Sequence, residues 1–511
     1  MSTLTRREFL KYGGGAVLLA ALGSPALAAC QTAPPLVKAD GRVASTGLAA
    51  GLDSARSSNP GSEARARREF DLTAAVTPVD LGTGEFMAWT YNGQALGPEI
   101  RVTEDDVVRV AVTNNLPDPT TVHWHGVPVP NAMDGVPGIT QPPIQPGETF
   151  IYEFVAWPSG TYWYHPHVGH QLDRGLVGPL IIDPKHELGD YDREYTLLLD
   201  DWVTVDGGAP AVALRGAGGM MSGGMMGGGM MHNPRQGDGG GNGPLQEPTY
   251  NAFAVNGQVA DAAAPLSVRQ GERVRLRLIN AGGATVFALR LAGHALTVTH
   301  ADGRPVEPME VDVLRIGMGE RYDVVFTADN PGRWKLYDLL NGGSAYLTLA
   351  TFVYQGSAAT RDSGDTLSQR YRWNDYRLLV GLPEEGMPPL EPTQDAQAFN
   401  MVLTGGHMSP YWGINGKIYP DTDKVVLPSG HRVRFDYFNQ SPMAHPMHLH
   451  GHFFEVVGSK GLRKDTLIVE GHMGRASIEF IADNPGDWMH HCHNIYHAEA
   501  GMMNIVRVSS E

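Results

Sequence analysis

Residues 273–280 read RVRLRLIN, so apolar and charged side chains alternate along this segment. Alternation with a period of two is typical of a β-strand that has one face in a core and the other in solvent. Two similar stretches, which also end in Asn, occupy residues 107–114 and 432–439. We therefore predict the same kind of half-buried strand in three separate parts of the chain.

The three strands belong to a longer internal repeat. Each copy opens with Asn-Gly followed by Gln or Lys, at 92–94, 256–258 and 415–417. Successive copies therefore begin 164 and 159 residues apart. A glycine followed two residues later by Tyr or Trp recurs nearer the end of each copy, at 160–162, 332–334 and 486–488. Because such self-similarity indicates a repeated structural unit, we predict an all-β fold of three consecutive Greek-key β-sandwich domains.

The composition agrees with this fold and narrows the range of partners. The chain has 511 residues with 63 Gly and 36 Pro, which suits many short strands and tight turns rather than helical bundles. Its formal net charge of −16 argues against nucleic acid or an anionic membrane surface as the main partner, because both require a concentrated basic face. We expect a monomer that does not bind nucleic acid.

The repeat places the three domains at 65–186, 187–365 and 366–511, after two segments that are set aside. Residues 1–29 are expected to be a twin-arginine export signal, with an apolar run far shorter than the roughly 20 residues of a membrane span. Residues 30–64 form an extended leader. We therefore expect a periplasmic or cell-envelope protein.

Two processing patterns overlap at the end of the export signal. Residues 27–30 read LAAC, which matches a lipobox that would make Cys30 a lipid-anchored first residue. Residues 26–28 read ALA, which matches an ordinary cleavage site. Both outcomes, anchored and released, stay open.

Four histidine pairs of the form His-x-His occur at matched offsets in the first and third copies of the repeat. Each pair presents two imidazoles on one face of a strand, because residues i and i+2 point the same way. The same offsets in the second copy carry no histidine. If the first and third domains meet at these faces, eight imidazoles converge, and imidazole suits copper, zinc or iron. The pairs are His123 and His125, His165 and His167, His448 and His450, and His491 and His493.

A second donor set surrounds Cys492, which stands between two of these histidines and therefore points to the opposite face. His445, His497 and Met502 can join it there. One Cys, two His and a weak axial thioether are the ligands of a blue, type 1 copper site. Pro166 occupies the equivalent position in the first domain, so we predict one such site.

The four motifs resemble those of the multicopper oxidases, specifically the three-domain laccase-like and bacterial copper-efflux oxidases. The residues that carry the resemblance read HWHG at 123–126, HPH at 165–167, HPMHLHG at 445–451 and HCH at 491–493. The resemblance implies cupredoxin-like domains and four copper ions. It also implies the one-electron oxidation of a reductant, coupled to the four-electron reduction of dioxygen to water.

The resemblance further assigns a role to each donor. It implies a type 1 copper at His445, Cys492, His497 and Met502, and a type 2 copper at His123 and His448. It implies one type 3 copper at His125, His165 and His493, and the other at His167, His450 and His491.

Three acidic residues are further candidates. Asp134 matches an acid that family members use to deliver protons to bound oxygen, although it could be only a turn residue before Gly135. Glu499 is a second candidate proton donor, or an acceptor of hydrogen bonds near the type 1 loop. Asp465 sits where the related copper oxidases have an acidic ligand for substrate copper, although it could equally be a loop charge.

A segment rich in Gly and Met, 216–243, indicates which substrate the protein binds. Thioethers are soft donors that prefer Cu(I), and methionines in a glycine-rich stretch cannot be filling a core. We predict capture of Cu(I), against the alternative of a flexible linker. The candidate ligands are Met220, Met221, Met225, Met226, Met230 and Met231.

The predicted function is therefore a multicopper oxidase that acts on Cu(I), on small phenols or on both, in copper tolerance. The axial Met502 should give a moderate potential, which favours cuprous ion and electron-rich phenols. A phenol-oxidising laccase without a role in copper homeostasis would share every ligand. A copper-storage protein would need the methionines but not the eight-histidine group, and a non-catalytic cupredoxin scaffold would lack the ligands.

Overall fold

A computed structural model describes residues 66–510, apart from 187–188, 190, 205–246, 344, 358–370, 388–389, 391–395 and 407–408. Residues 66–511 form one compact unit. The predicted export signal, the leader, Cys30 and the methionine segment lie outside the described residues. Among the described residues, no helix is long and apolar enough to cross a membrane.

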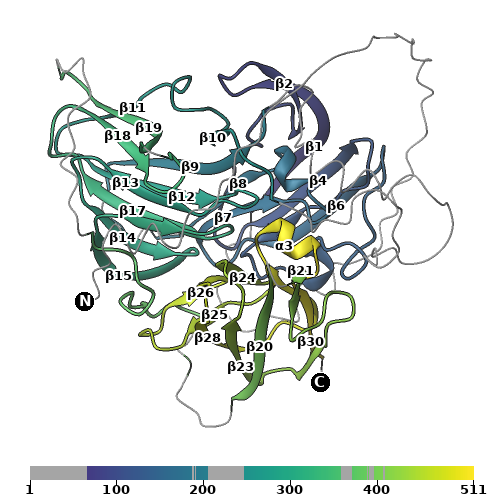
Figure 1. Cartoon of the computed structure of the whole chain (residues 1–511). Helices are drawn as coiled ribbons and strands as arrows, with labels where there is room; N and C mark the ends of the chain where they lie inside the picture. The colour runs from purple at the N-terminus through teal and green to yellow at the C-terminus, as the bar shows by residue number, and fades with distance from the viewer. Residues whose placement is uncertain are drawn as a thin grey trace, which may run out of the picture. The chain divides into compact units, whose positions relative to one another are not determined.

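The described chain is almost entirely β-structure and forms six sheets in three sequential pairs (Figure 1). The sheets of the first pair have the strand orders β2-β1-β4-β6 and β3-β8-β7-β5. Their strands are β1 (Arg67–Asp80), β2 (Glu85–Tyr91), β3 (Ile100–Thr103), β4 (Val107–Asn115), β5 (His123–His125), β6 (Thr149–Val155), β7 (Gly160–His165) and β8 (Gly178–Asp183).

The second pair of sheets has the strand orders β10-β9-β12-β17-β14-β15 and β11-β19-β18-β13-β16. Its strands are β9 (Arg193–Trp202), β10 (Ala252–Val255), β11 (Leu266–Val268), β12 (Arg273–Asn280), β13 (Phe287–Leu291), β14 (Leu296–Ala301), β15 (Arg304–Val311), β16 (Leu314–Ile316), β17 (Arg321–Thr327), β18 (Arg333–Asp338) and β19 (Leu347–Tyr354).

The third pair has the strand orders β21-β20-β23-β28-β25-β26 and β22-β30-β29-β24-β27. Its strands are β20 (Gln397–Gly406), β21 (Ser409–Ile414), β22 (Val425–Pro428), β23 (Arg432–Asn439), β24 (His445–Leu449), β25 (Phe454–Val456), β26 (Arg463–Lys464), β27 (Thr466–Val469), β28 (Gly474–Ile481), β29 (Gly486–Cys492) and β30 (Met503–Ser509). The short helices are η1 (Asn131–Met133), η2 (Leu172–Arg174) and α3 (Ile495–Glu499).

The internal repeat is visible in the backbone. Asn92, Asn256 and Asn415 have φ values of 55°, 52° and 54°, and each is followed by a glycine with φ near 74°. Positive φ at two successive positions favours Asn-Gly, which explains why this dipeptide opens each copy. The strand pairs β1 with β4, β9 with β12 and β20 with β23 are all parallel. The prediction of three cupredoxin-like β-sandwiches is therefore confirmed, while their boundaries stay a prediction.

One face of β12 departs from the prediction. β4 and β23 alternate between buried and half-buried residues, but β12 is buried at every position after Arg273. Arg275 donates to Asp323 Oδ2 at 2.6 Å, and Arg277 donates to Thr161 Oγ1 on β7 at 2.9 Å. The charged face of β12 thus packs against the first domain instead of facing solvent.

Candidate metal centre

The histidine pairs lie on adjacent strands of two sheets. In the first domain, β5 pairs with β7 so that His123 is opposite His165. In the third domain, β24 pairs with β29 so that His448 is opposite His491. Each sheet therefore presents two His-x-His pairs side by side, as the period of the strands requires.

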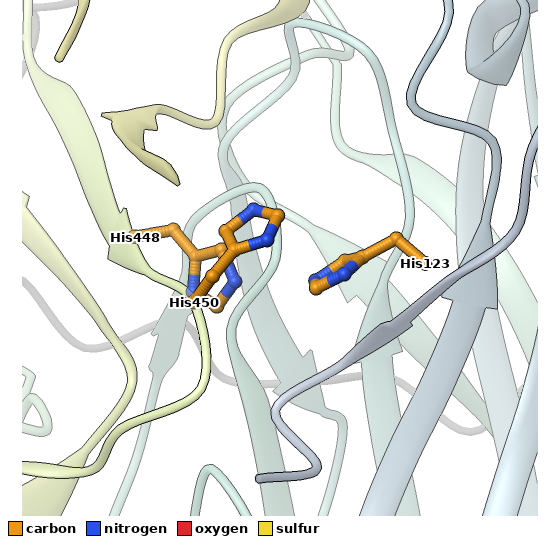
Figure 2. Close-up of side chains that lie close together, drawn as sticks. All are labelled: His123, His448 and His450. Atoms are coloured by element: carbon orange, nitrogen blue, oxygen red, sulfur yellow. The ribbon is translucent and has the colours of Figure 1, made fainter. Parts of the chain in front are cut away.

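The structure brings all eight imidazoles together across the two domains. The rings of His123 and His450 stack with centroids 3.8 Å apart, and those of His125 and His448 stack at 3.9 Å. His491 Nε2 lies 3.1 Å from His450 Nε2 and 3.4 Å from His167 Nε2. Figure 2 shows His123 directed toward His448 and His450 from an opposing segment of chain. The remaining members are His165, whose ring is 5.3 Å from that of His123, and His493, 4.9 Å from His125.

Several imidazole nitrogens in this group are buried without a hydrogen-bond partner among the described residues. An unpaired buried nitrogen is costly, and a metal ion would satisfy it. Burial also lowers the pKa of most of these histidines well below the ordinary value, which keeps them in the neutral form that binds metal. The unpaired atoms are His123 Nε2, His125 Nδ1, His165 Nε2, His448 Nε2 and both ring nitrogens of His493.

The donor groups fit copper, but they do not by themselves fix which histidine serves which ion. One compact group, in which the donor atoms lie within 4.8 Å of one another, consists of His167, His450 and His491, as predicted for one type 3 copper. Other groups of the same size cross the predicted sets, such as His123 with His448 and His450. The individual assignments therefore stay a prediction.

Three of the four predicted type 1 donors, His445, Cys492 and His497, lie together inside the third domain. Cys492 Sγ is 3.5 Å from His445 Nδ1 and 3.6 Å from His497 Nδ1. All three residues are buried, and burial raises the pKa of the Cys492 thiol, so a metal ion must displace its proton. Met502 is also fully buried, and its carbonyl oxygen accepts the N–H of Cys492 at 3.1 Å.

Two neighbours of these donors were not foreseen from the sequence. The Trp412 ring lies on His497, with centroids 3.8 Å apart. Glu247 Oε1 lies 3.2 Å from the outer nitrogen, Nε2, of His497. The corresponding atom of His445 contacts Ser441 Oγ at 2.7 Å. The only sequence signal for Glu247 was its place shortly after the methionine segment.

Asp134 contacts the eight-histidine group. Its carbonyl oxygen accepts the Nδ1–H of His123 at 2.8 Å, and its carboxylate lies 3.0 Å from His450 Nδ1. Gly135 follows with φ of +80°, and a Cβ there would lie 1.9 Å from the Val122 carbonyl oxygen. Only glycine therefore lets this turn approach β5 so closely. This position suits a proton donor, a role that stays a prediction.

Asp465 lies beside the eight-histidine group, and its predicted role in binding substrate copper stays a prediction. It is fully buried, and its carboxylate lies 3.2 Å from His125 Nε2. Arg321 donates to both carboxylate oxygens, at 2.7 and 2.6 Å. Burial alone would raise the pKa of Asp465, but the Arg321 guanidinium holds it well below the ordinary value.

Glu499 is the last residue of α3 and its side chain is exposed. The helix begins at Asn494, whose side chain caps it by accepting the N–H groups of Tyr496 and His497. This cap fixes the start of α3, the helix that carries His497. The role of Glu499 in proton delivery stays a prediction.

Comparison with known proteins identifies the family. Matches to multicopper oxidase domains cover residues 74–187, 193–357 and 392–511. The multicopper oxidase MmcO of Mycobacterium tuberculosis is 38% identical over 493 residues, covering 93% of this chain and 92% of the relative. Copper resistance protein A of Escherichia coli is 29% identical, covering 86% and 92%.

The solved structures give the same result. A crystal structure of a multi-copper oxidase from Pseudomonas thermotolerans superposes with a TM-score of 0.67 at 30% identity, covering 87% of this chain and 100% of that one. With matches in all three parts of the chain and donors suited to copper, the protein belongs to the multicopper oxidase family of oxygen-using oxidoreductases.

Proposed function

We propose that this enzyme oxidises Cu(I) with dioxygen, which is reduced by four electrons to water, and that it serves copper tolerance. It would hold four copper ions, one at the Cys492 set and three among the eight histidines. Bound there, copper would carry electrons from the reductant to dioxygen. The observation that carries the choice of substrate is the carboxylate of Glu247 at the outer nitrogen of His497.

A negative charge at this nitrogen favours a cation over a neutral phenol. Glu247 also accepts the Asn494 side-chain N–H at 2.6 Å, so its carboxylate is held in place while its side chain stays 31% exposed. A partly exposed carboxylate beside an electron-entry ligand raises the local concentration of cations. Cu(I) needs soft donors as well, which the predicted methionines would supply.

The methionine segment is attached next to this site. Glu247 is the first described residue after 205–246, and Thr204 is the last before it. The Thr204 N–H donates to Asn251 Oδ1 at 2.8 Å. The described residues just before the segment therefore contact those just after it. This attachment supports the proposal that Met220 to Met231 collect Cu(I) for the type 1 site.

The backbone joins the two donor groups directly. Cys492 lies between His491 and His493, so one covalent path leads from the type 1 set into the eight-histidine group. The His491 Nδ1–H donates to the Cys492 carbonyl oxygen at 2.8 Å, which orients that imidazole. Asp134 contacts His123 and His450 and would hold a proton beside the same group.

Oxygen uptake with Cu(I) or a methoxyphenol as sole reductant tests the substrate. Replacement of Glu247 by Gln should raise the apparent KM for Cu(I) about 5-fold, as expected for the loss of ~1 kcal/mol from a partly exposed charge interaction. Oxidation of the phenol and the blue absorption should not change. The control is Glu153→Gln, because the Glu153 carboxylate accepts from Arg67 within the first domain.

Two results would refute this proposal. A wild-type enzyme that oxidises the phenol efficiently but not Cu(I) would identify a laccase without a cuprous role. An unchanged KM for Cu(I) in the Glu247 variant would remove the carboxylate from the substrate site. Export by the twin-arginine pathway, a periplasmic location and the lipid anchor at Cys30 remain predictions.

A further inference from the structure

Two buried carboxylates flank the eight-histidine group, and they are arranged alike. Asp134, from the first domain, contacts His123 of its own domain and His450 of the third. Asp465, from the third domain, accepts the Nδ1–H of His448 at 2.9 Å through its carbonyl oxygen. Its carboxylate lies 3.2 Å from His125 of the first domain. Each aspartate thus orients one imidazole from each domain.

The two carboxylates differ in what holds them. Asp465 is bound through both oxygens by Arg321, the first residue of β17 in the second domain. Arg321 is fully buried and also donates to the carbonyl oxygens of Thr161 and Gly319, both at 3.1 Å. One arginine therefore joins the first, second and third domains behind the histidines. A bidentate guanidinium fixes a carboxylate more strictly than a single hydrogen bond.

The backbone around Arg321 and Asp465 leaves room for both side chains. Gly126, directly after His125, has φ of +86°, and a Cβ there would lie 2.4 Å from Arg321 Nη2 and 2.6 Å from Asp465 Oδ2. Asp302, also from the second domain, accepts the N–H groups of Asp465 at 3.2 Å and Thr466 at 3.1 Å. The second domain thus fixes both the main chain and the side chain of Asp465.

The unpaired nitrogens show the consequence for the histidines. Asp465 Oδ1 and Thr466 Oγ1 both lie 3.2 Å from His125 Nε2, while His125 Nδ1 has no partner among the described residues. His448 donates from Nδ1, while its Nε2 is unpaired. A hydrogen bond at one ring nitrogen fixes the tautomer and leaves the other nitrogen free to bind metal.

We propose that Arg321 and Asp465 are a positioning pair for the copper centre: Arg321 holds Asp465 so that His125 presents Nδ1 and His448 presents Nε2 to the metal. The second domain, whose equivalent repeat positions carry no histidine, would then control a site built by the other two. This inference rests on the proposed copper centre, but it does not depend on which reductant the enzyme uses.

The test compares Arg321→Lys and Asp465→Asn in the full-length, copper-loaded enzyme. Lysine keeps the positive charge but cannot bind both carboxylate oxygens, and asparagine keeps the shape of Asp465. Both variants should release copper to a chelator at 10- to 100-fold lower chelator concentration, the usual cost of losing a residue that orients a metal ligand. The type 2 signal in electron paramagnetic resonance should be lost first. The blue absorption at Cys492 should persist.

Arg304→Lys is the matched control. Arg304 is also a buried arginine of the second domain and donates to Tyr162 OH of the first domain and to Glu384, each at 2.6 Å. This variant should keep the type 2 signal even if its melting temperature falls. Type 2 copper retained in both test variants, or lost equally in the control, would overturn the proposal. A wild-type enzyme that binds no type 2 copper would instead refute the copper centre itself.

Discussion

The type 1 site and the eight-histidine group are built in different ways. The donors of the first, His445, Cys492 and His497, come from one domain and approach one another within 3.6 Å. The donors of the eight-histidine group come from the first and third domains. They are supported by Arg321, which belongs to the second domain. A site within one domain can form when that domain folds. A site between domains depends on how they pack.

The strongest test of this difference is Cys492→Ser. The thiolate is the only sulfur anion among the type 1 donors, and a serine oxygen does not replace it. We expect complete loss of the blue absorption and of oxidase activity, because the path for electrons is broken.

The type 2 signal and three of the four copper ions should remain, since none of the eight histidines is altered. Copper analysis with visible and electron paramagnetic resonance spectroscopy measures both groups together. A variant that stays blue would refute the type 1 assignment, and loss of all copper would show that the two groups are not independent.

Asp134→Asn tests the interdomain group alone. The substitution keeps the size of the side chain next to His450 but removes an ionisable proton. We expect oxygen reduction to slow by roughly 10²-fold, within the range for loss of a general acid. During turnover the blue absorption should bleach, because electrons would reach the type 1 site faster than dioxygen removes them.

Stopped-flow absorption at acidic and neutral pH measures this effect. Thr140→Val is a suitable control on the same loop, since Thr140 Oγ1 contacts the Val136 backbone. If the turnover of Asp134→Asn is unchanged across this pH range, Asp134 is only a turn residue and does not deliver protons.

The methionine segment should affect only the delivery of Cu(I) to the type 1 site. Replacement of all six methionines between Met220 and Met231 by Ser should raise the apparent KM for Cu(I) at low free copper and leave kcat unchanged. Phenol oxidation should be unchanged or faster, because an organic reductant does not use thioethers.

Oxygen-uptake kinetics with each reductant distinguish the outcomes. Equal loss of both activities would indicate damaged folding or copper loading. Full activity toward Cu(I) would favour the linker interpretation of the segment.

The smallest expected effect concerns a contact between α3, the helix that carries His497, and the first domain. Asp173 accepts the Tyr496 OH of α3 at 2.5 Å and the Tyr250 OH at 2.9 Å. Burial, with the nearby Asp201, raises the pKa of Asp173 from 3.8 to about 8. Between about pH 4 and pH 8 the unfolded chain has lost this proton and the folded chain has not, so stability falls as the pH rises.

Asp173→Asn should remove this part of the pH dependence, so its melting temperature should fall less than that of the wild type between pH 5 and pH 8. Asp312→Asn is the control, since Arg372 lowers the pKa of Asp312 and its loss should not alter the slope in this range. Identical slopes for Asp173→Asn and the wild type would show that Asp173 is ionised in the folded protein.

Much of the fold and most of the metal donors could be predicted because their signals are local. A period of two marks a strand, and Asn-Gly marks a turn with positive φ, wherever they occur in a chain. The His-x-His pairs place two imidazoles on one face by strand geometry alone, and a cysteine between two of them must point the other way. These features need no knowledge of how the domains meet.

The sequence by itself therefore determined three similar β-sandwiches, two donor groups and the residues available to each. Only the tertiary structure decided that Arg275 and Arg277 are buried, that Asp465 supports His125, and that Glu247 and Trp412 contact His497. Arg321 and Asp465 are 144 residues apart, and Glu247 and Asn494 are 247 apart. Such contacts depend on the packing of whole domains. The sequence around each residue therefore does not indicate its partner.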